Sequence, residues 1–240
     1  MATLLIILSV LAGSATQPVV RPAPTSGGLQ ETALYHVMLM RAAPGRLLDL
    51  MDHLKVQAET RRAAGRGSSF LMRHSQGDQW DLMLLDLVPD GVVSLPEQRA
   101  FEPRLDSLIA WREDLWVRGP DPDAVDAKLS GAGYFHVEMF VALPGKRAEL
   151  LAQRKMENAF LQEIDRPLNL IFVRAGGAAW DMFTLGAYRD LKHFAESADI
   201  PEDVQERAAV AAGFEAANRI GTYLRSLMAY HHDTLATAVP

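Results

Sequence analysis

The chain has 240 residues, a formal net charge of −6, 49% hydrophobic residues and no cysteine. This length and apolar content allow one large or two small domains with a core, and they argue against intrinsic disorder. The missing thiols exclude disulfides, thiolate–metal sites and a cysteine nucleophile, while the acidic balance argues against a nucleic-acid partner.

An apolar run near the start predicts export. Leu4–Leu11 is too short to span a bilayer, which needs about 20 apolar residues. With the small residues 12–15 behind it, the run fits a signal peptide over 1–15, although no Lys or Arg precedes it. The alternatives are a true start upstream, an uncleaved anchor and a buried helix. Residues 16–32 predict a disordered linker. We therefore expect a periplasmic or secreted protein with no integral membrane span after cleavage.

The rest of the chain repeats itself at a spacing of 100 residues. The matching segments are Tyr35–Val37 with Phe135–Val137, Pro44–Arg46 with Pro144–Lys146, and Gly77–Asp81 with Gly177–Asp181. Agreement without a gap at several anchors indicates a tandem duplication. We expect units at 33–120 and 133–236, joined through the turn-rich segment Gly119–Asp123.

Both units predict the same order of elements from apolar periodicity and Pro-Gly turns. The first unit is expected to contain strand Leu34–Arg41, helix Gly45–Ala64, strands Ser69–His74 and Trp80–Leu87, helix Glu97–Glu113 and strand Leu115–Arg118. The second is expected to contain strand Tyr134–Val141, helix Arg147–Ile164, strands Leu168–Arg174 and Trp180–Tyr188, helix Val204–Met228 and strand Ala229–Leu235, with an insertion near 199–212. The order β-α-β-β-α-β predicts an α+β protein made of two ferredoxin-like units.

Two such units, with Pro-Gly after the first strand and Trp-Asp opening the third, resemble the dimeric α+β barrel superfamily. This superfamily includes antibiotic-biosynthesis monooxygenase-like, stress-responsive barrel and NIPSNAP-like domains. Trp180–Tyr188 followed by Leu191–Ala195 is similar to their third strand leading into the second helix, and the resemblance covers almost all of 33–236. It implies that the two antiparallel sheets join into one barrel with helices outside. Since one chain holds both units, we expect a monomer (a pseudo-dimer) or a weak homo-oligomer.

Strand alternation predicts which side chains line such a barrel. We expect Tyr35, Val37 and Leu39, with Phe135, Val137, Met139 and Val141, to face the helices. We expect a mostly apolar cavity between the sheets to be lined by His36, Met38, Met40, His136, Glu138 and Phe140, and by the third-strand sets Trp80, Leu84, Asp86 and Trp180, Met182, Thr184, Gly186. A lining of this kind suits a small apolar or aromatic ligand.

Three side chains are candidates for acid–base catalysis. His36 and His136 occupy matched positions, and histidine as a residue type suits proton transfer near neutral pH. Glu138 stands where the first unit has Met38. A carboxylate two residues from a histidine on one strand face can orient it or act as a base. The alternatives are structural hydrogen bonds across the sheet for the histidines and a rim ion pair for Glu138.

The predicted substrate-binding residues are Trp80, Trp180, Met38, Phe140, Thr184 and Arg174. The tryptophans are core residues in the alternative interpretation, and Arg174 is solvated or paired with an acid. Asp81 and Asp181 follow the matched tryptophans and predict structural hydrogen bonds.

Neither a metal nor a cofactor is predicted. For His231 and His232 a polar exit from the last strand is favoured over a metal set with His136 and Glu138. Tandem units also occur in chlorite dismutase-like proteins, which take haem on a helix-borne histidine, and we find no clear equivalent of that histidine.

Three functions remain open at this point. The first is a cofactor-independent enzyme, monooxygenase- or isomerase-like, that uses His136 and Glu138 with help from His36. The second is a non-catalytic carrier or sensor of a lipophilic ligand. The third is a degenerate barrel that acts through its surface, for which we expect an interior filled by side chains.

Overall fold

A computed structural model of the chain describes residues 33–89 and 102–239, so the predicted signal peptide and linker lie outside the described residues. Its strands are β1 (Ala33–Ala42), β2 (Ser69–Gln76), β3 (Leu82–Leu87), β4 (Ile109–Gly119), β5 (Tyr134–Ala142), β6 (Leu170–Gly177), β7 (Met182–Tyr188) and β8 (Met228–Ala238). Its helices are α1 (Leu47–Ala63), α2 (Pro103–Asp106), α3 (Pro122–Leu129), α4 (Arg147–Glu163), α5 (Leu191–Ala195), α6 (Glu202–Ala211) and α7 (Ile220–Arg225). None of the helices in this part of the chain is long and apolar enough to cross a membrane.

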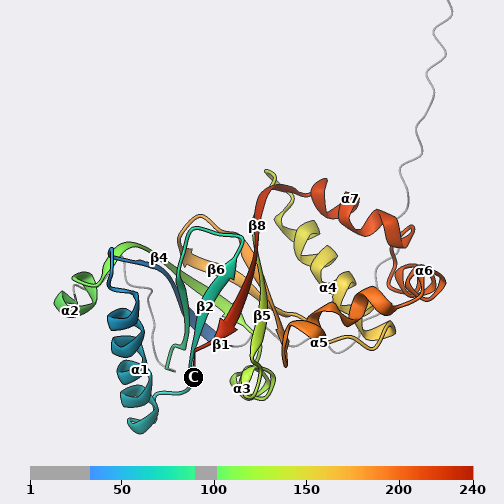
Figure 1. The fold of residues 1–240 in the computed structure, drawn as a ribbon. Coiled ribbons are helices and arrows are strands. Elements are labelled where there is room, and N and C mark those ends of the chain that lie inside the picture. The colour runs from blue at the N-terminus through green and yellow to red at the C-terminus, as the bar shows by residue number, and fades with distance from the viewer. Residues whose placement is uncertain (1–32, 90–101, 240) are drawn as a thin grey trace, which may run out of the picture.

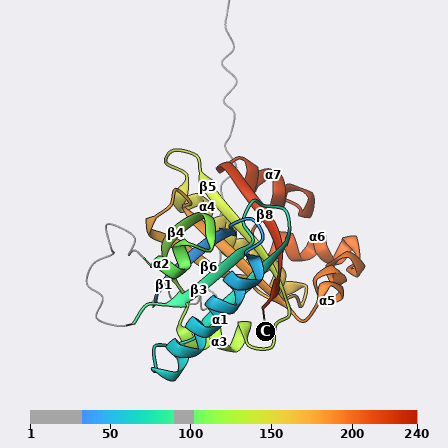
Figure 2. The same cartoon turned by 60° about the vertical axis from the view of Figure 1, so that its left-hand side comes forward.

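The eight strands close into one antiparallel barrel in the order β1-β3-β2-β8-β5-β7-β6-β4. Strands β1–β4 with α1 and α2 form the first unit, and β5–β8 with α4–α7 form the second (Figure 1). The units meet where β2 pairs with β8 and where β4 pairs with β6. The helices of the two units lie on opposite sides of the barrel, as the turned view in Figure 2 also shows. The predicted α+β fold of two tandem ferredoxin-like units is thereby confirmed.

Two predicted helices are wrong in extent. Strand β4 begins at Ile109, inside the predicted helix Glu97–Glu113, of which residues 97–101 lie outside the described part. The segment Trp111–Val117 extends because it pairs with β1 on one side and with β6 on the other, and this tertiary pairing outweighs its local pattern. The predicted helix Val204–Met228 divides into α6 and α7, because Gly213 between them has a φ of +96°.

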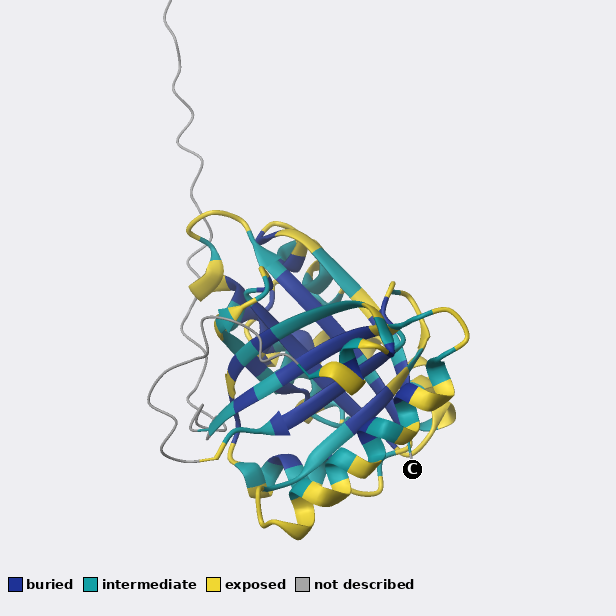
Figure 3. Cartoon of the chain, turned by 90° about the vertical axis from the view of Figure 1, so that its left-hand side faces the viewer, coloured by how far each residue is buried: buried dark blue, intermediate teal, exposed yellow. Residues whose placement is uncertain are grey.

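The barrel interior is filled by apolar side chains from both units. Its buried core includes Tyr35, Val37, Leu39, Met83, Leu85, Leu115, Val117, Phe135, Val137, Met139, Phe172, Phe183 and Leu185. Helix α3, which connects the units, adds Val125 and Leu129 to this core from one end (Figure 1). In Figure 3 the strands are mostly buried or intermediate, whereas exposed residues gather on the turns and on the helices. The described side chains thus pack the space in which we expected a ligand cavity.

The predicted assignment of the strand faces is therefore wrong. Met38 and Met40 pack against Leu50 and Leu54 of α1, and Phe140 and Met182 pack against Leu150 of α4. His36, His136, Glu138, Leu84, Asp86, Thr184 and Gly186 share these outer faces by alternation along their strands. The larger, more uniformly apolar faces lie inside because only the interior is shut off from water on every side. Trp80 and Trp180 belong to the interior core, because each precedes its strand and does not follow the strand's alternation.

Asp81 and Asp181 have the structural role that the repeat predicted. Asp81 Oδ2 accepts a hydrogen bond from the Ala42 amide at 2.8 Å, and Asp181 Oδ2 accepts one from the Ala142 amide at 2.9 Å. Each aspartate therefore fixes the end of the first strand of its unit.

The β4–β6 contact between the units yields a stability prediction. Gly177 has a φ of +87°, and a Cβ there would lie 2.3 Å from the carbonyl oxygen of Asp114 on β4. Gly145 has a φ of +78° and an open space beside it. Both Gly→Ala changes introduce left-handed strain of about 1 kcal/mol, but only Gly177→Ala also forces β6 away from β4. Urea unfolding should show a clearly larger loss for Gly177→Ala. Equal losses would contradict the close approach.

Candidate functional site

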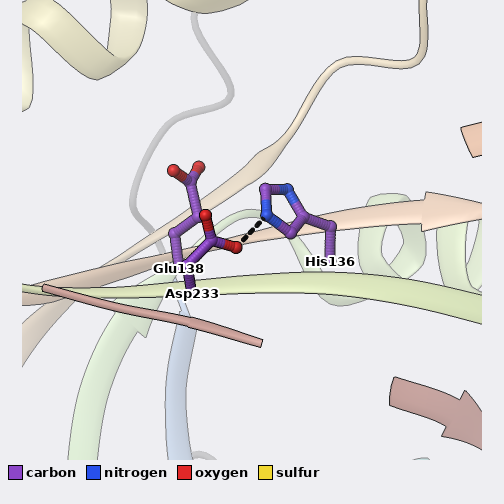
Figure 4. A group of neighbouring side chains, drawn as sticks. All are labelled: His136, Glu138 and Asp233. Carbon is purple, nitrogen blue, oxygen red and sulfur yellow. Dashed lines mark hydrogen bonds and ion pairs between the residues drawn. The ribbon is translucent and has the colours of Figure 1, made fainter. Parts of the chain in front are cut away.

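A histidine and an aspartate meet on the outer face of the second unit. His136 on β5 and Asp233 on β8 come from paired strands, and His136 Nε2 lies 2.5 Å from Asp233 Oδ1 (Figure 4). His136 is partly buried, whereas the Asp233 side chain is more than half exposed. The pair therefore lies at the boundary between the helix-covered sheet and solvent.

A buried ion network lies behind this pair. Arg154 on α4 is 2% exposed, and its Nη1 donates to Glu138 Oε2 at 3.1 Å. The same guanidinium donates through Nη2 to Glu157 and through Nε to Gln153 Oε1. Thr184 Oγ1 on β7 donates to Glu138 Oε2 at 3.1 Å, so this buried carboxylate has two donors. In Figure 4 the Glu138 carboxylate points away from the hydrogen bond between His136 and Asp233.

These charges shift the pKa values of the site. Burial disfavours the charged form of His136, but the hydrogen bond to Asp233 and the charges of Glu138, Asp233 and Glu157 outweigh it, so the pKa of His136 is raised. The hydrogen bond from His136 holds the pKa of Asp233 below its usual value. Burial, assisted by repulsion from Glu138, raises the pKa of Glu157 despite the nearby Arg154. The site therefore favours a proton on His136.

Aromatic side chains border His136. The ring of Phe194 on α5 lies 5.4 Å from the imidazole, 5.2 Å from Tyr188 and 6.0 Å from Tyr134. Burial raises the pKa of Tyr188, so its phenol stays neutral. This aromatic wall gives the polar site an apolar side.

The first unit repeats the histidine–aspartate pair but not the network of Glu138, Arg154 and Glu157. His36 Nε2 lies 2.8 Å from Asp114 Oδ1, and the imidazole stacks on Trp116 at 4.7 Å. Arg112 donates two hydrogen bonds to Asp114. The repeat places Met38, Leu54, Gln57 and Leu84 where the second unit has Glu138, Arg154, Glu157 and Thr184. The two copies of one fold therefore differ in where their buried charges lie.

The structure brings some of the predicted site residues together and separates others. His136, Glu138, Phe140 and Thr184 lie in one cluster of the second unit, where Arg154 also stacks over the Phe140 ring at 5.0 Å. His36 and Met38 lie on the outer face of the first unit and do not join this cluster. Trp80 and Trp180 precede β3 and β7, which start beside the ends of β1 and β5, so they lie at the end of the barrel opposite α3. The Arg174 guanidinium lies near the β6–β7 turn, where Nη1 donates to the Ala178 carbonyl at 3.3 Å.

The sequence-based reasoning missed Asp233, Arg154, Glu157 and Phe194 as members of the site. Comparison of the repeats could have found Arg154. The first unit has an apolar leucine, Leu54, at the matched helix position, so the charge in the second unit stands out. Asp233 could have been found by aligning the last strands, where Asp114 lies opposite Met38 as Asp233 lies opposite Glu138.

His136, Glu138 and Asp233 also form a possible metal-binding set, with ligand atoms all within 4.8 Å of one another. Glu138 already accepts hydrogen bonds from Arg154 and Thr184, and the Arg154 cation lies 3.1 Å from Glu138. A fixed positive charge beside a ligand opposes a divalent cation, so the arrangement favours acid–base chemistry over metal binding.

Solved structures share this architecture at low sequence identity. An anthrone oxidase-like protein matches with a TM-score of 0.58 and 10% identity, over 88% of this chain and 93% of its own. A monooxygenase-like protein from Lactobacillus acidophilus NCFM matches with a TM-score of 0.51 and 7% identity, over 87% and 93%. A chlorite dismutase-like protein matches with a TM-score of 0.50 and 13% identity, over 87% and 96%.

The chain has the fold of the dimeric α+β barrel superfamily. It carries both halves of the barrel in tandem. No family model and no curated protein matches the sequence, so these likenesses establish the fold alone.

The residues of this chain do not fit a haem between sheet and helices. In the first unit Leu50 and Leu54 of α1 are fully buried against the sheet, and in the second Leu150, Gln153 and Arg154 of α4 fill the same layer. Of the helix-borne histidines, His193 accepts a hydrogen bond from the Arg189 amide through Nδ1, and His53 lies on the tightly packed α1. An apolar slot for a porphyrin is therefore absent from the described helix–sheet layers.

The His136–Asp233 pair predicts a pH dependence of stability. A raised folded pKa for histidine adds stability below its unfolded pKa of about 6.5, and this is lost as pH rises through the folded value. The lowered pKa of Asp233 adds stability above the unfolded pKa of aspartate, about 3.9. This stability is lost as the pH falls through the folded pKa of Asp233. Asp233→Asn should lower the His136 pKa measured by NMR. The variant should also lose more free energy of unfolding, relative to the unmodified protein, near pH 5 than at pH 9, because His136 is charged at the lower pH.

Asp203→Asn is the control, because Asp203 pairs with Arg207 on an exposed helix face. It should leave the pKa of His136 unchanged. An equal His136 shift in both variants would contradict the assignment of the raised pKa to Asp233.

Proposed function

We propose that this protein is a cofactor-independent enzyme that abstracts a proton from a small, neutral aromatic substrate on the outer face of its second unit. His136 is the base, Asp233 orients it, and Glu138 with Glu157 stabilises the imidazolium that forms. The chemistry proposed earlier for the barrel interior thus moves to the boundary between the sheet and α4–α5.

The observation that carries the proposal is the network of Glu138, Arg154 and Glu157 between β5 and α4, which has no counterpart at the matched positions of the first unit. Removing charges from water costs several kcal/mol per ion, and apolar residues often stabilise such positions equally well. The first unit folds with Met38 and Leu54 where the second has Glu138 and Arg154. The fold does not require the network, so a functional demand is its best explanation.

The hydrogen bond to Asp233 determines which imidazole nitrogen can act. Nε2 of neutral His136 donates to Asp233, which leaves Nδ1 as the acceptor for a substrate proton. The raised pKa of His136 makes its neutral form a stronger base, and the fraction of this neutral form grows as the pH rises. Three carboxylates and one arginine surround it, so an anionic substrate is disfavoured.

The substrate class follows from the aromatic wall and gains support from the structural neighbours. The ring of Phe194 lies beside His136, and the buried rings of Tyr134 and Tyr188 pack against Phe194. Two neighbours are named as anthrone oxidase-like and monooxygenase-like. Removal of a proton from an aromatic carbon acid such as anthrone gives an electron-rich enolate. Reaction of this enolate with O₂, with loss of water, would complete an oxygenation, whereas return of the proton at another atom would complete an isomerisation.

Anthrone in D₂O is the test substrate, with deuterium incorporation and O₂ consumption followed together. Asp233→Asn should lower the exchange rate by about 100-fold or more, because the base loses its oriented tautomer. The pair of changes Glu138→Met and Arg154→Leu copies the first unit and should preserve folding while reducing exchange.

Met38→Leu, at the matched position of the first unit, is the control and should keep the full rate. Exchange without O₂ uptake supports the isomerase branch. Saturable binding of unchanged anthrone, with no deuterium exchange, would instead support the carrier hypothesis and contradict the proposed enzymatic function.

We also propose that the protein is exported, from the apolar run Leu4–Leu11 and the small residues behind it. Intact mass measurement of the protein recovered from its cells should show loss of about 15 residues. A mass that retains Met1–Ala15 in a soluble cytoplasmic fraction would contradict this.

A further inference from the structure

A second histidine–carboxylate pair lies at the end of the barrel opposite α3, outside the proposed active site. His232 on β8 belongs to the second unit, and Asp78 in the β2–β3 turn belongs to the first. His232 Nδ1 lies 3.0 Å from Asp78 Oδ2. The pair therefore bridges the two units where β2 and β8 meet.

Asp78 is held more rigidly than a surface ion pair requires. Its side chain is 3% exposed, and Oδ2 also accepts a hydrogen bond from Trp80 Nε1 at 3.0 Å. The Gln79 amide donates to Oδ1 at 2.6 Å, and the amide of Asp78 itself donates to His74 Nε2 at 3.2 Å. A buried, fixed carboxylate makes Nδ1 of His232 the protonated nitrogen and leaves Nε2 as an acceptor.

Two aromatic rings stand beside this acceptor. Trp180 lies 4.8 Å from the His232 ring and 5.5 Å from the Tyr230 ring, both at steep angles. Tyr230 is 49% exposed, and the His232 side chain is 38% exposed. We call these three rings, with Asp78, the aromatic corner. Its rings are fixed by packing on one side and open to solvent on the other.

The opposite corner of the barrel lacks this arrangement. There Glu113 on β4 occupies the position that His232 has on β8, since Glu113 pairs with Leu39 as His232 pairs with Met139. Glu113 accepts a hydrogen bond from Trp180 Nε1 at 3.0 Å, and the repeat places Ala178 where the first unit has Asp78. A barrel end can thus be closed without a histidine–aspartate pair.

We propose that the aromatic corner is a second binding site, for a neutral, planar molecule of the phenol class. The ligand's hydroxyl donates to His232 Nε2, and its ring packs against Tyr230. The buried carboxylate of Asp78 borders the site and disfavours an anion. This site is independent of the proton transfer proposed at His136.

Imidazole ¹⁵N NMR tests the first requirement without a ligand. Neutral His232 should be in the Nδ1–H tautomer, because Asp78 accepts that proton. An Nε2–H tautomer would overturn the proposal, since no acceptor would then face the ligand.

Titration with phenol tests the binding itself. Phenol should shift the His232 Nε2 resonance saturably, and anisole, which lacks the hydroxyl proton, should bind more weakly. Tyr230→Ala should weaken phenol binding about fivefold through lost ring contact. His232→Leu should remove the preference for phenol over anisole. Tyr230 is exposed, so its variant tests the site even if His232→Leu disturbs the junction of the units.

His53→Gln, a histidine change on α1, is the matched control and should leave phenol binding unchanged. Phenol shifts at His136 but not at His232 would overturn this proposal and leave the proposed function intact. Phenol binding at His232 together with no effect of Asp233→Asn on exchange would sustain this site and remove the proposed function.

Discussion

Closure of the eight-stranded sheet is the constraint on which the rest of this structure depends. A closed barrel leaves no strand edge unpaired, and its single interior is shut off from water on every side. Apolar side chains from both units fill that interior, with α3 packed at one end and Trp80 and Trp180 at the other. Polar chemistry is therefore confined to the outer faces under the helices and to the barrel ends.

The duplication supplies an internal comparison that a single domain lacks. Both units keep a histidine–aspartate pair on the outer face, which identifies His36–Asp114 and His136–Asp233 as features that the shared fold tolerates. Only the second unit adds Glu138 and Arg154 in the layer below α4. Since an equivalent layer folds with methionine and leucine, the energetic cost of the buried charges points to selection for something other than stability.

The repeat, the Pro-Gly turns and the strand alternation sufficed to predict the architecture. The sequence could not show which face of each strand lies inside, because both faces of β1 and β5 are rich in large apolar residues. Strand alternation from Trp80 and Trp180 would place Leu84 and Thr184 inside the barrel with them. The tryptophans do lie inside, but they precede their strands, so Leu84 and Thr184 face outward. In the site, His136 and Glu138 could be predicted because they lie two residues apart on one strand. Asp233 and Arg154 could not, because only the pairing of β8 with β5 and the packing of α4 bring them to these residues.

Strand β8 links the two proposed sites. Asp233 faces outward to His136, and its neighbour His232 faces inward to Asp78, because adjacent residues of a strand point to opposite faces. A slip of β8 by one residue would exchange these faces and break both pairs at once. The same strand joins the units, because it pairs with β2 of the first unit and β5 of the second. Closure of the barrel and both histidine–aspartate pairs therefore depend on the register of β8. The register of β8 is fixed despite these polar residues, because Thr234 and Ala236 are buried on the inner face of the same strand.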